Sequence, residues 1–232
     1  SLSFLGSLVY LLNLSTAQHY YVPLEMFATH FATLPWIFLF GTKFIEDGKK
    51  KSLLLLALTT LIAAPSAHTP TLFYVFFGLF TLYTCFLAFL SKTRLKHVLV
   101  ALSTILVLNS FWLLPNIYFV INHGKLVAES KIHSQFSERA FLTGKKYGDL
   151  KNTAILKNFL FEWGEYDDTQ KKFVGLLDEW LDHIKKSQVY LIGYSVFAFV
   201  LLGIFRAYKK KNSYGLALLP VFAISMFFIA ND

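Results

Sequence analysis

The sequence has little charge and almost no cysteine. Only 16% of its 232 residues are charged and 55% are hydrophobic, whereas a soluble domain has about 25% charged and about 45–50% apolar residues. The single cysteine, Cys85, lies inside an apolar run, which excludes a disulfide framework and a cysteine-based zinc site. The chain also has no HExxH, Walker, GxSxG or dinucleotide-binding motif. The composition indicates a membrane protein.

Long apolar runs account for most of the sequence. With their flanking residues, those at 26–42, 71–91, 98–115, 189–205 and 213–230 reach the roughly 20 residues that a spanning helix needs. The runs at 2–12 and 52–64 are shorter. The second meets Pro65 in the stretch PSAHTP, so it either continues through the proline or ends part-way as a broken helix. We expect an all-α polytopic helical membrane protein.

The two ends of the chain both lie inside apolar runs. The first run has neither a charged start nor a small-residue cleavage site, so it does not have the pattern of a signal peptide. We therefore expect the chain to be a piece of a longer protein.

Basic residues predict the orientation. They gather in the short segments 42–51, 92–97 and 206–212, which the positive-inside rule places in the cytoplasm. The run order then predicts membrane helices over 1–115, an extracytoplasmic helical cap over 116–188 and further membrane helices over 189–232. The net charge of +8 follows from this topology, so we do not expect nucleic-acid binding.

The stretch LNSFWLLPNIYFVINHG, residues 108–124, stands at the predicted outer boundary. Trp112 and Tyr118 are typical of the membrane interface, where amphipathic rings lie at headgroup level. Pro115 favours the end or a kink of the helix, because it lacks an N–H and biases the preceding residue away from helix. We expect the chain to leave the membrane here.

The predicted cap contains helical patterns. Ser137 and Asp149 are candidate caps of two short helices. Residues 169–187 have apolar side chains at helical spacing, which predicts one amphipathic helix. This helix would lie flat on the outer leaflet or pack on neighbouring helices.

Three polar stretches, 13–30, 65–70 and 161–168, are expected to meet on the outer face. Ionisable groups at membrane depth are costly and are therefore candidates for function. Each also has a structural interpretation: Glu25 complements a helix N-terminus, His68 is a turn residue, and WGEYDD is a solvated acidic turn. No metal-ligand spacing or cofactor motif is present. The candidate site residues are His19, Glu25, His30, His68, Trp163, Glu165 and Tyr166.

Several of these motifs resemble a family. The motifs that carry this resemblance are, in chain order, GSLVYLLNLSTAQHYY, NSFWLLPNIYF, SQFSERAFLTG and LFEWGEY. Through them the chain resembles multi-spanning GT-C-type glycosyltransferases, most of all the bacterial arabinofuranosyltransferase-like and related uncharacterised membrane proteins. Leu14 departs from the proline that is often seen at the corresponding turn.

This resemblance implies a function. It implies an integral protein of the bacterial plasma membrane that transfers a sugar from a polyprenyl-phosphate donor to a cell-envelope glycan on the outer face. A carboxylate base of the first outer loop would lie upstream, which leaves Glu25 as the candidate base and His19, His30 and His68 as candidates for the leaving phosphate. The alternatives are a transporter or flippase subunit, or a non-catalytic envelope scaffold whose aromatics Trp163, Tyr166 and Trp180 stack on sugars.

Overall fold

The computed structural model describes residues 2–22, 25–93 and 95–230; the side chains of residues 2, 25, 132–137 and 139–140 lie outside this description. These described residues form eleven α-helices, two 3-10 turns and one short hairpin. The prediction of an all-α membrane protein is confirmed. The chain forms two compact units: unit 1 is Ser1–Leu24, Gln135–Phe205 and Ser225–Asp232, and unit 2 is Glu25–Ser134 and Arg206–Ile224.

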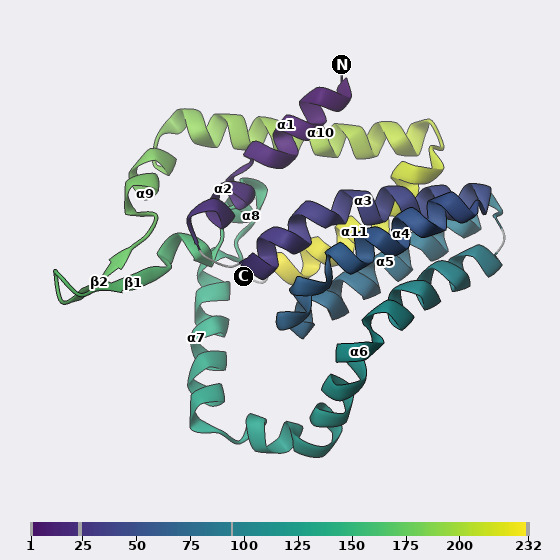
Figure 1. Ribbon diagram of the computed structural model, residues 1–232. Helices are drawn as coiled ribbons and strands as arrows, with labels where there is room; N and C mark the ends of the chain where they lie inside the picture. The colour runs from purple at the N-terminus through teal and green to yellow at the C-terminus, as the bar shows by residue number, and fades with distance from the viewer. Residues whose placement is uncertain (1, 23–24, 94, 231–232) are drawn as a thin grey trace. The chain divides into compact units, whose positions relative to one another are not determined.

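Unit 2 is a bundle of long helices. It contains α3 (Glu25–Asp47), α4 (Lys50–Ile62), η1 (Ala64–His68), α5 (Pro70–Ser91), α6 (Leu95–Ala128) and most of α11 (Ser213–Ile229) (Figure 1). Its core is aromatic, with fully buried Phe80 packed edge-on against Phe38 at 5.2 Å between ring centroids. Edge-to-face contacts of this kind are favoured by the ring quadrupoles. Phe44, Phe73 and Phe76 are also buried in this core.

Three described helices are long and apolar enough to cross a membrane. They are α5, α6 and α10 (Ser187–Lys209), and α11 and residues 3–12 of α1 (Leu2–Leu12) are shorter apolar helices. The predicted run at 26–42 lies in α3, which does not meet the same criterion. The run at 52–64 gives α4 of 13 residues, followed by the 3-10 turn η1. The membrane helices therefore reach beyond the predicted boundaries in some places and fall short in others.

Helix α6 continues through Pro115, so of the two predicted effects of this proline, a helix end or a kink, the helix end is wrong. Its 34 residues correspond to about 51 Å at 1.5 Å per residue, well beyond a bilayer core of about 30 Å. Figure 1 shows that the helix curves along its length, as expected when a proline removes one backbone hydrogen bond. Trp112 packs on Phe73 with 5.0 Å between centroids and donates to Asn109 Oδ1 at 2.8 Å. Trp112 is thus part of the helix packing.

The three basic segments lie at the same end of unit 2. His97, near the start of α6, contacts the carbonyl oxygen of Ile45 near the end of α3, with 3.1 Å between Nδ1 and O. The Tyr214 hydroxyl, at the start of α11, donates to the Glu46 carboxylate. Gly48, at φ +61°, makes the turn between α3 and α4, a conformation that glycine adopts without steric cost. These contacts bring segments 42–51 and 92–97 together and place Tyr214, two residues after segment 206–212, beside segment 42–51.

Unit 1 joins both ends of the sequence to its middle. It contains α1, α2 (Leu14–Tyr21), most of α7 (Lys131–Tyr147), α8 (Leu150–Ala154), η2 (Phe159–Glu162), β1 (Gly164–Asp167), β2 (Lys172–Gly175), α9 (Asp178–Ile184) and most of α10. The predicted cap at Asp149 is confirmed, because its Oδ1 accepts from the Asn152 N–H at 2.7 Å. Ser137 lies inside α7 and is not a cap.

The single amphipathic helix predicted over 169–187 is replaced by a hairpin and a short helix. Asp167 Oδ1 accepts from the backbone N–H of Thr169 at 2.8 Å and of Gln170 at 3.2 Å, which stabilises a turn. Lys171 then takes φ +50° and the chain returns as β2. The apolar residues on both sides of this turn follow a helical spacing, but the turn and β2 interrupt the segment. Helix α9 therefore forms only over Asp178–Ile184.

Candidate functional site

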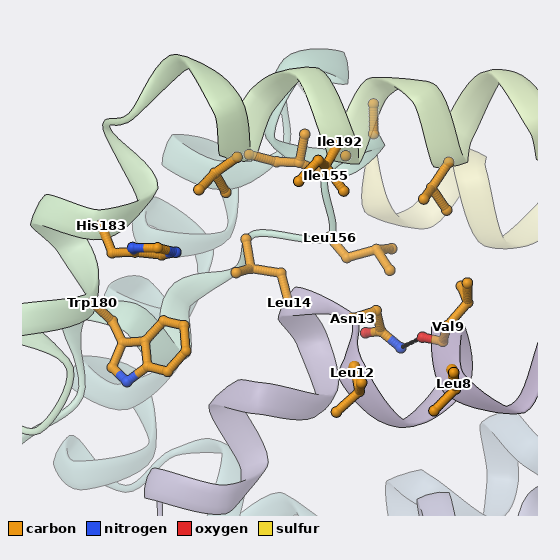
Figure 2. A pocket seen from close by; sticks show the side chains of 14 residues that line it. Leu8, Val9, Leu12, Asn13, Leu14, Ile155, Leu156, Trp180, His183 and Ile192 are labelled. Atoms are coloured by element: carbon orange, nitrogen blue, oxygen red, sulfur yellow. Dashed lines mark hydrogen bonds between the residues drawn. The ribbon is translucent and has the colours of Figure 1, made fainter. Parts of the chain in front are cut away.

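An apolar pocket of about 400 Å³ opens in unit 1. Its walls come from α1, the start of α2, the segment after α8, α9 and α10, and the lining is aliphatic except for Asn13, Trp180 and His183 (Figure 2). Ligand pockets in proteins generally measure about 300–1,000 Å³ and combine an apolar lining with a few polar groups. One wall belongs to α10, a candidate membrane span. The pocket therefore suits an apolar chain.

Asn13 holds together the wall formed by α1 and α2. Its Oδ1 accepts from the Thr16 N–H at 3.0 Å, which caps α2. Its Nδ2 donates to the carbonyl oxygens of Val9 at 3.0 Å and Tyr10 at 2.8 Å near the end of α1. One amide thus satisfies backbone groups of both helices and places Leu14 at the pocket.

Gln18 links two residues of the pocket lining, Leu14 and Leu156. It is fully buried, and its Nε2 donates to the carbonyl oxygen of Leu14 at 2.9 Å and of Leu156 at 3.2 Å. Leu156 has φ +61°, a left-handed conformation that costs about 1–2 kcal/mol for a residue with a Cβ. The Leu156 side chain lines the pocket. The surrounding structure therefore maintains a strained backbone where it presents an apolar side chain to the cavity.

A small hydrophobic core supports the pocket. Its buried members are Val22, Leu160, Phe161, Leu177 and Ile184, against which Trp180 packs. The Trp180 ring also meets the Tyr21 ring at 5.6 Å and the His183 ring at 5.5 Å between centroids. Trp180 belongs to both the core and the pocket wall, so a change in this core is expected to alter the pocket.

Lys157, next to the pocket wall in sequence, belongs to a charged cluster with Lys146 and Glu162. Lys157 comes directly after the lining residue Leu156, and its ammonium lies 5.5 Å from the centroid of the buried Tyr147 ring. Lys146 forms an ion pair with Glu162. The Lys146 ammonium holds the pKa of Glu162 below its usual range. Burial, reinforced by the positive charge of Lys146, lowers the pKa of Lys157. The cluster thus has two ammonium groups around one carboxylate.

The structure separates most of the predicted site residues. Trp163, Glu165 and Tyr166 lie on the hairpin of unit 1, but alternation along β1 puts Trp163 and Glu165 on one face and Tyr166 on the other. His19 is half-buried in α2, and burial lowers its pKa.

The remaining predicted residues belong to unit 2. His30 packs against Phe76 with 5.6 Å between ring centroids, and His68 is exposed at the end of η1. Glu25 begins α3, but its side chain lies outside the described residues. The meeting of the three polar stretches at one site stays a prediction. Within the described ranges, no group of three or more His, Cys, Asp or Glu side chains could hold a metal ion.

Sequence reasoning missed the residues that build the pocket. Gln18 belongs to the polar stretch that we singled out, yet its partner Leu156 is 138 positions away. Phe161 and Lys157 have no local signal, because burial and ring contacts with distant residues define them. Asn13 was detectable as a cap, since asparagine is a preferred N-cap residue, and its side chain accepts from the backbone N–H three positions later.

The comparisons with known proteins replace the glycosyltransferase resemblance. No curated protein and no solved structure matches the chain. The family profile that matches describes a 6-pyruvoyl-tetrahydropterin synthase related domain of membrane proteins, and it covers residues 3–141, more than half of the chain. No glycosyltransferase family matches, so the assignment to GT-C-type enzymes, which relied on loosely spaced aromatic and proline motifs, is wrong. The chain belongs to the 6-pyruvoyl-tetrahydropterin synthase related domain family of membrane proteins.

Proposed function

We propose that this membrane protein binds a lipid that has a long apolar chain and a phosphate-bearing head. The observation that carries this proposal is the apolar pocket of unit 1. One wall of this pocket is formed by the candidate membrane span α10, and Lys157 comes directly after the lining residue Leu156. Apolar chains gain about 0.8 kcal/mol for each buried CH₂ group. The Lys157 ammonium, which lies in the field of both the Glu162 carboxylate and the Lys146 ammonium, would donate a charge-assisted hydrogen bond to a phosphate oxygen.

The reaction that we propose for this lipid is transfer of its sugar to a cell-envelope glycan. A polyprenyl phosphate would place its chain in the pocket and its phosphate near Lys157. The alternative is a transporter or flippase subunit, which is favoured by the end of α4 at Ile62 and the following turn η1 with Pro65, because interrupted helices often mark transport sites. A covalent glycan product would distinguish transfer from lipid movement without product.

Filling the pocket is expected to weaken lipid binding. Val196→Trp adds a large side chain to the α10 wall, so we expect at least tenfold weaker binding of polyprenyl phosphate, phosphatidic acid and polyprenol to the purified full chain, measured by native mass spectrometry. Val200→Trp, one turn further along α10 at an exposed position, is the matched control. Lys157→Gln should weaken the binding of polyprenyl phosphate and phosphatidic acid by about tenfold, which corresponds to about 1.4 kcal/mol. It should leave the binding of polyprenol unchanged.

Three results would contradict parts of the lipid-binding proposal. Unchanged binding by Val196→Trp would refute the pocket as the lipid site. Equal loss for all three lipids in Lys157→Gln would show that Lys157 supports the fold and does not contact phosphate. A preference for phosphatidic acid over polyprenyl phosphate would indicate a phospholipid ligand and count against sugar transfer.

The proposed orientation is that of a bacterial plasma-membrane protein, with segments 42–51, 92–97 and 206–212 cytoplasmic and 116–188 outside. The support is the contact between segments 42–51 and 92–97, and the hydrogen bond from Tyr214, just after segment 206–212, to Glu46. In a Cys85→Ser background, we expect Lys172→Cys to react with an impermeant maleimide in intact cells. Lys210→Cys should react only after the membrane is opened. The reverse pattern would contradict the orientation.

A further inference from the structure

The hairpin of unit 1 presents two aromatic rings to solvent. Tyr166 of β1 is the direct partner of Phe173 in β2, and their rings meet edge-on with 5.5 Å between centroids. Phe173 is 75% exposed and Tyr166 is 53% exposed. Apolar rings paired in this way lie on one face of a pleated ribbon. This exposed pair is not explained by the pocket or by the core of unit 1.

Two glycines follow the aromatic pair on the same face of the hairpin. Gly164 is paired with Gly175, and residues two apart along a strand lie on one face, so both glycines lie beside the aromatic pair, about 7 Å along the strands. A Cβ on Gly175 would meet Asp178 Oδ1 at 2.1 Å. The Asp178 carboxylate therefore occupies the space that a side chain at 175 would fill. The aromatic pair and the Asp178 carboxylate therefore lie on the same face of the hairpin.

We propose that this face, formed by Tyr166, Phe173, Gly164 and Asp178, binds one ring of a neutral glycan. The C–H face of a sugar ring carries a small positive charge and packs against the negative face of an aromatic ring. Sugar hydroxyls donate to a carboxylate, and such charge-assisted hydrogen bonds are about twice as strong as neutral ones.

Charge selects the class of partner. The segment 163–179 contains Glu165, Asp167, Asp168, Asp178 and Glu179 but only Lys171 and Lys172 as bases. An acidic surface repels anionic lipid headgroups and anionic polysaccharides. A neutral glycan satisfies both the rings and the carboxylate without this penalty. This inference goes beyond lipid binding and does not depend on it, since the hairpin face and the pocket share no lining residue.

Titration with soluble oligosaccharides tests the inference. We expect neutral oligosaccharides of glucose, mannose, galactose or arabinose to bind the purified full chain in calorimetry, whereas a uronic-acid oligosaccharide should not bind. Phe173→Ala should weaken the binding at least tenfold, and Asp178→Asn should weaken it less. Phe141→Ala, an equally exposed phenylalanine of α7, is the control and should bind as the native chain does.

The contrary results are specific. Absence of binding by every neutral oligosaccharide would overturn the inference, and so would a Phe173→Ala variant that binds like the native chain. If Phe173→Ala instead lowers adsorption to lipid vesicles and no glycan binds, the aromatic pair is a membrane anchor. Because Phe173 is largely exposed, its replacement should leave the fold intact, which an unchanged circular dichroism spectrum and unchanged lipid binding would verify.

Discussion

Phe161→Ala is expected to lower the free energy of unfolding by about 3–5 kcal/mol, the range for deleting a fully buried aromatic ring. Phe161 is only 1% exposed and stands in the small core with Leu160, Leu177 and Ile184. A core of so few side chains has little material with which to close the cavity. Trp180 packs on this core and lines the pocket, so lipid binding should weaken together with stability.

The measurement is thermal unfolding of the detergent-purified protein, followed by near-ultraviolet circular dichroism. Phe159→Ala is the matched control, because Phe159 lies in the same 3-10 turn η2 and is 43% exposed. We expect it to cost less than about 1 kcal/mol, as is usual for exposed positions. Equal losses in the two variants would show that the core of unit 1 does not have the packing described above.

Gln18→Glu is expected to destabilise the protein by about 3–5 kcal/mol at neutral pH, the cost of an uncompensated buried charge. Gln18 is 0% exposed, and its Nε2 donates to the carbonyl oxygens of Leu14 and Leu156. A carboxylate oxygen at this position would face two carbonyl oxygens and have no proton to donate. The strained turn at Leu156 would lose its restraint, and the pocket rim with it.

The pH dependence gives this variant a distinctive signature. Burial raises the pKa of the new carboxyl in the folded state above the unfolded value of about 4.3. The folded protein therefore retains the proton more strongly, so the part of the loss that comes from the buried charge is absent below about pH 4.3. It grows as the pH rises and becomes constant above the folded pKa. Gln18→Met, which brings no charge, should cost about 1–2 kcal/mol at every pH. A loss in Gln18→Glu that does not vary between pH 4 and 8 would contradict burial of this side chain.

The orientation and the function raise separate questions. The contacts of His97 with Ile45 and of Tyr214 with Glu46 bring the basic segments together. Charge clusters in a sequence predict a side of the membrane, whereas packing shows only that they share an end. The maleimide experiment joins the two observations. Lipid binding and glycan binding are tested by variants at different positions, so either can fail alone.

Local patterns in the sequence were sufficient for the helical class, the apolar spans and the Asp149 cap. Hydrophobic runs and caps depend on neighbouring residues, so a single sequence carries their signal. The same patterns failed at Pro115 and over 169–187. There, tertiary packing of α6 and the turn at Asp167 outweighed local preference. Loose aromatic and proline motifs also led to the wrong family.

Only the tertiary structure assembled the candidate site. Gln18 meets Leu156 across 138 positions, Glu162 meets Lys146, and Asp178 fills the space beside Gly175. Such contacts follow from how distant segments pack, and no periodicity or motif records them. The sequence by itself determined that the chain is helical and lies in a membrane, because burial of apolar surface in lipid depends on composition and length. The pocket, its rim and the hairpin face were decided by folding, because they need side chains that only the fold brings together.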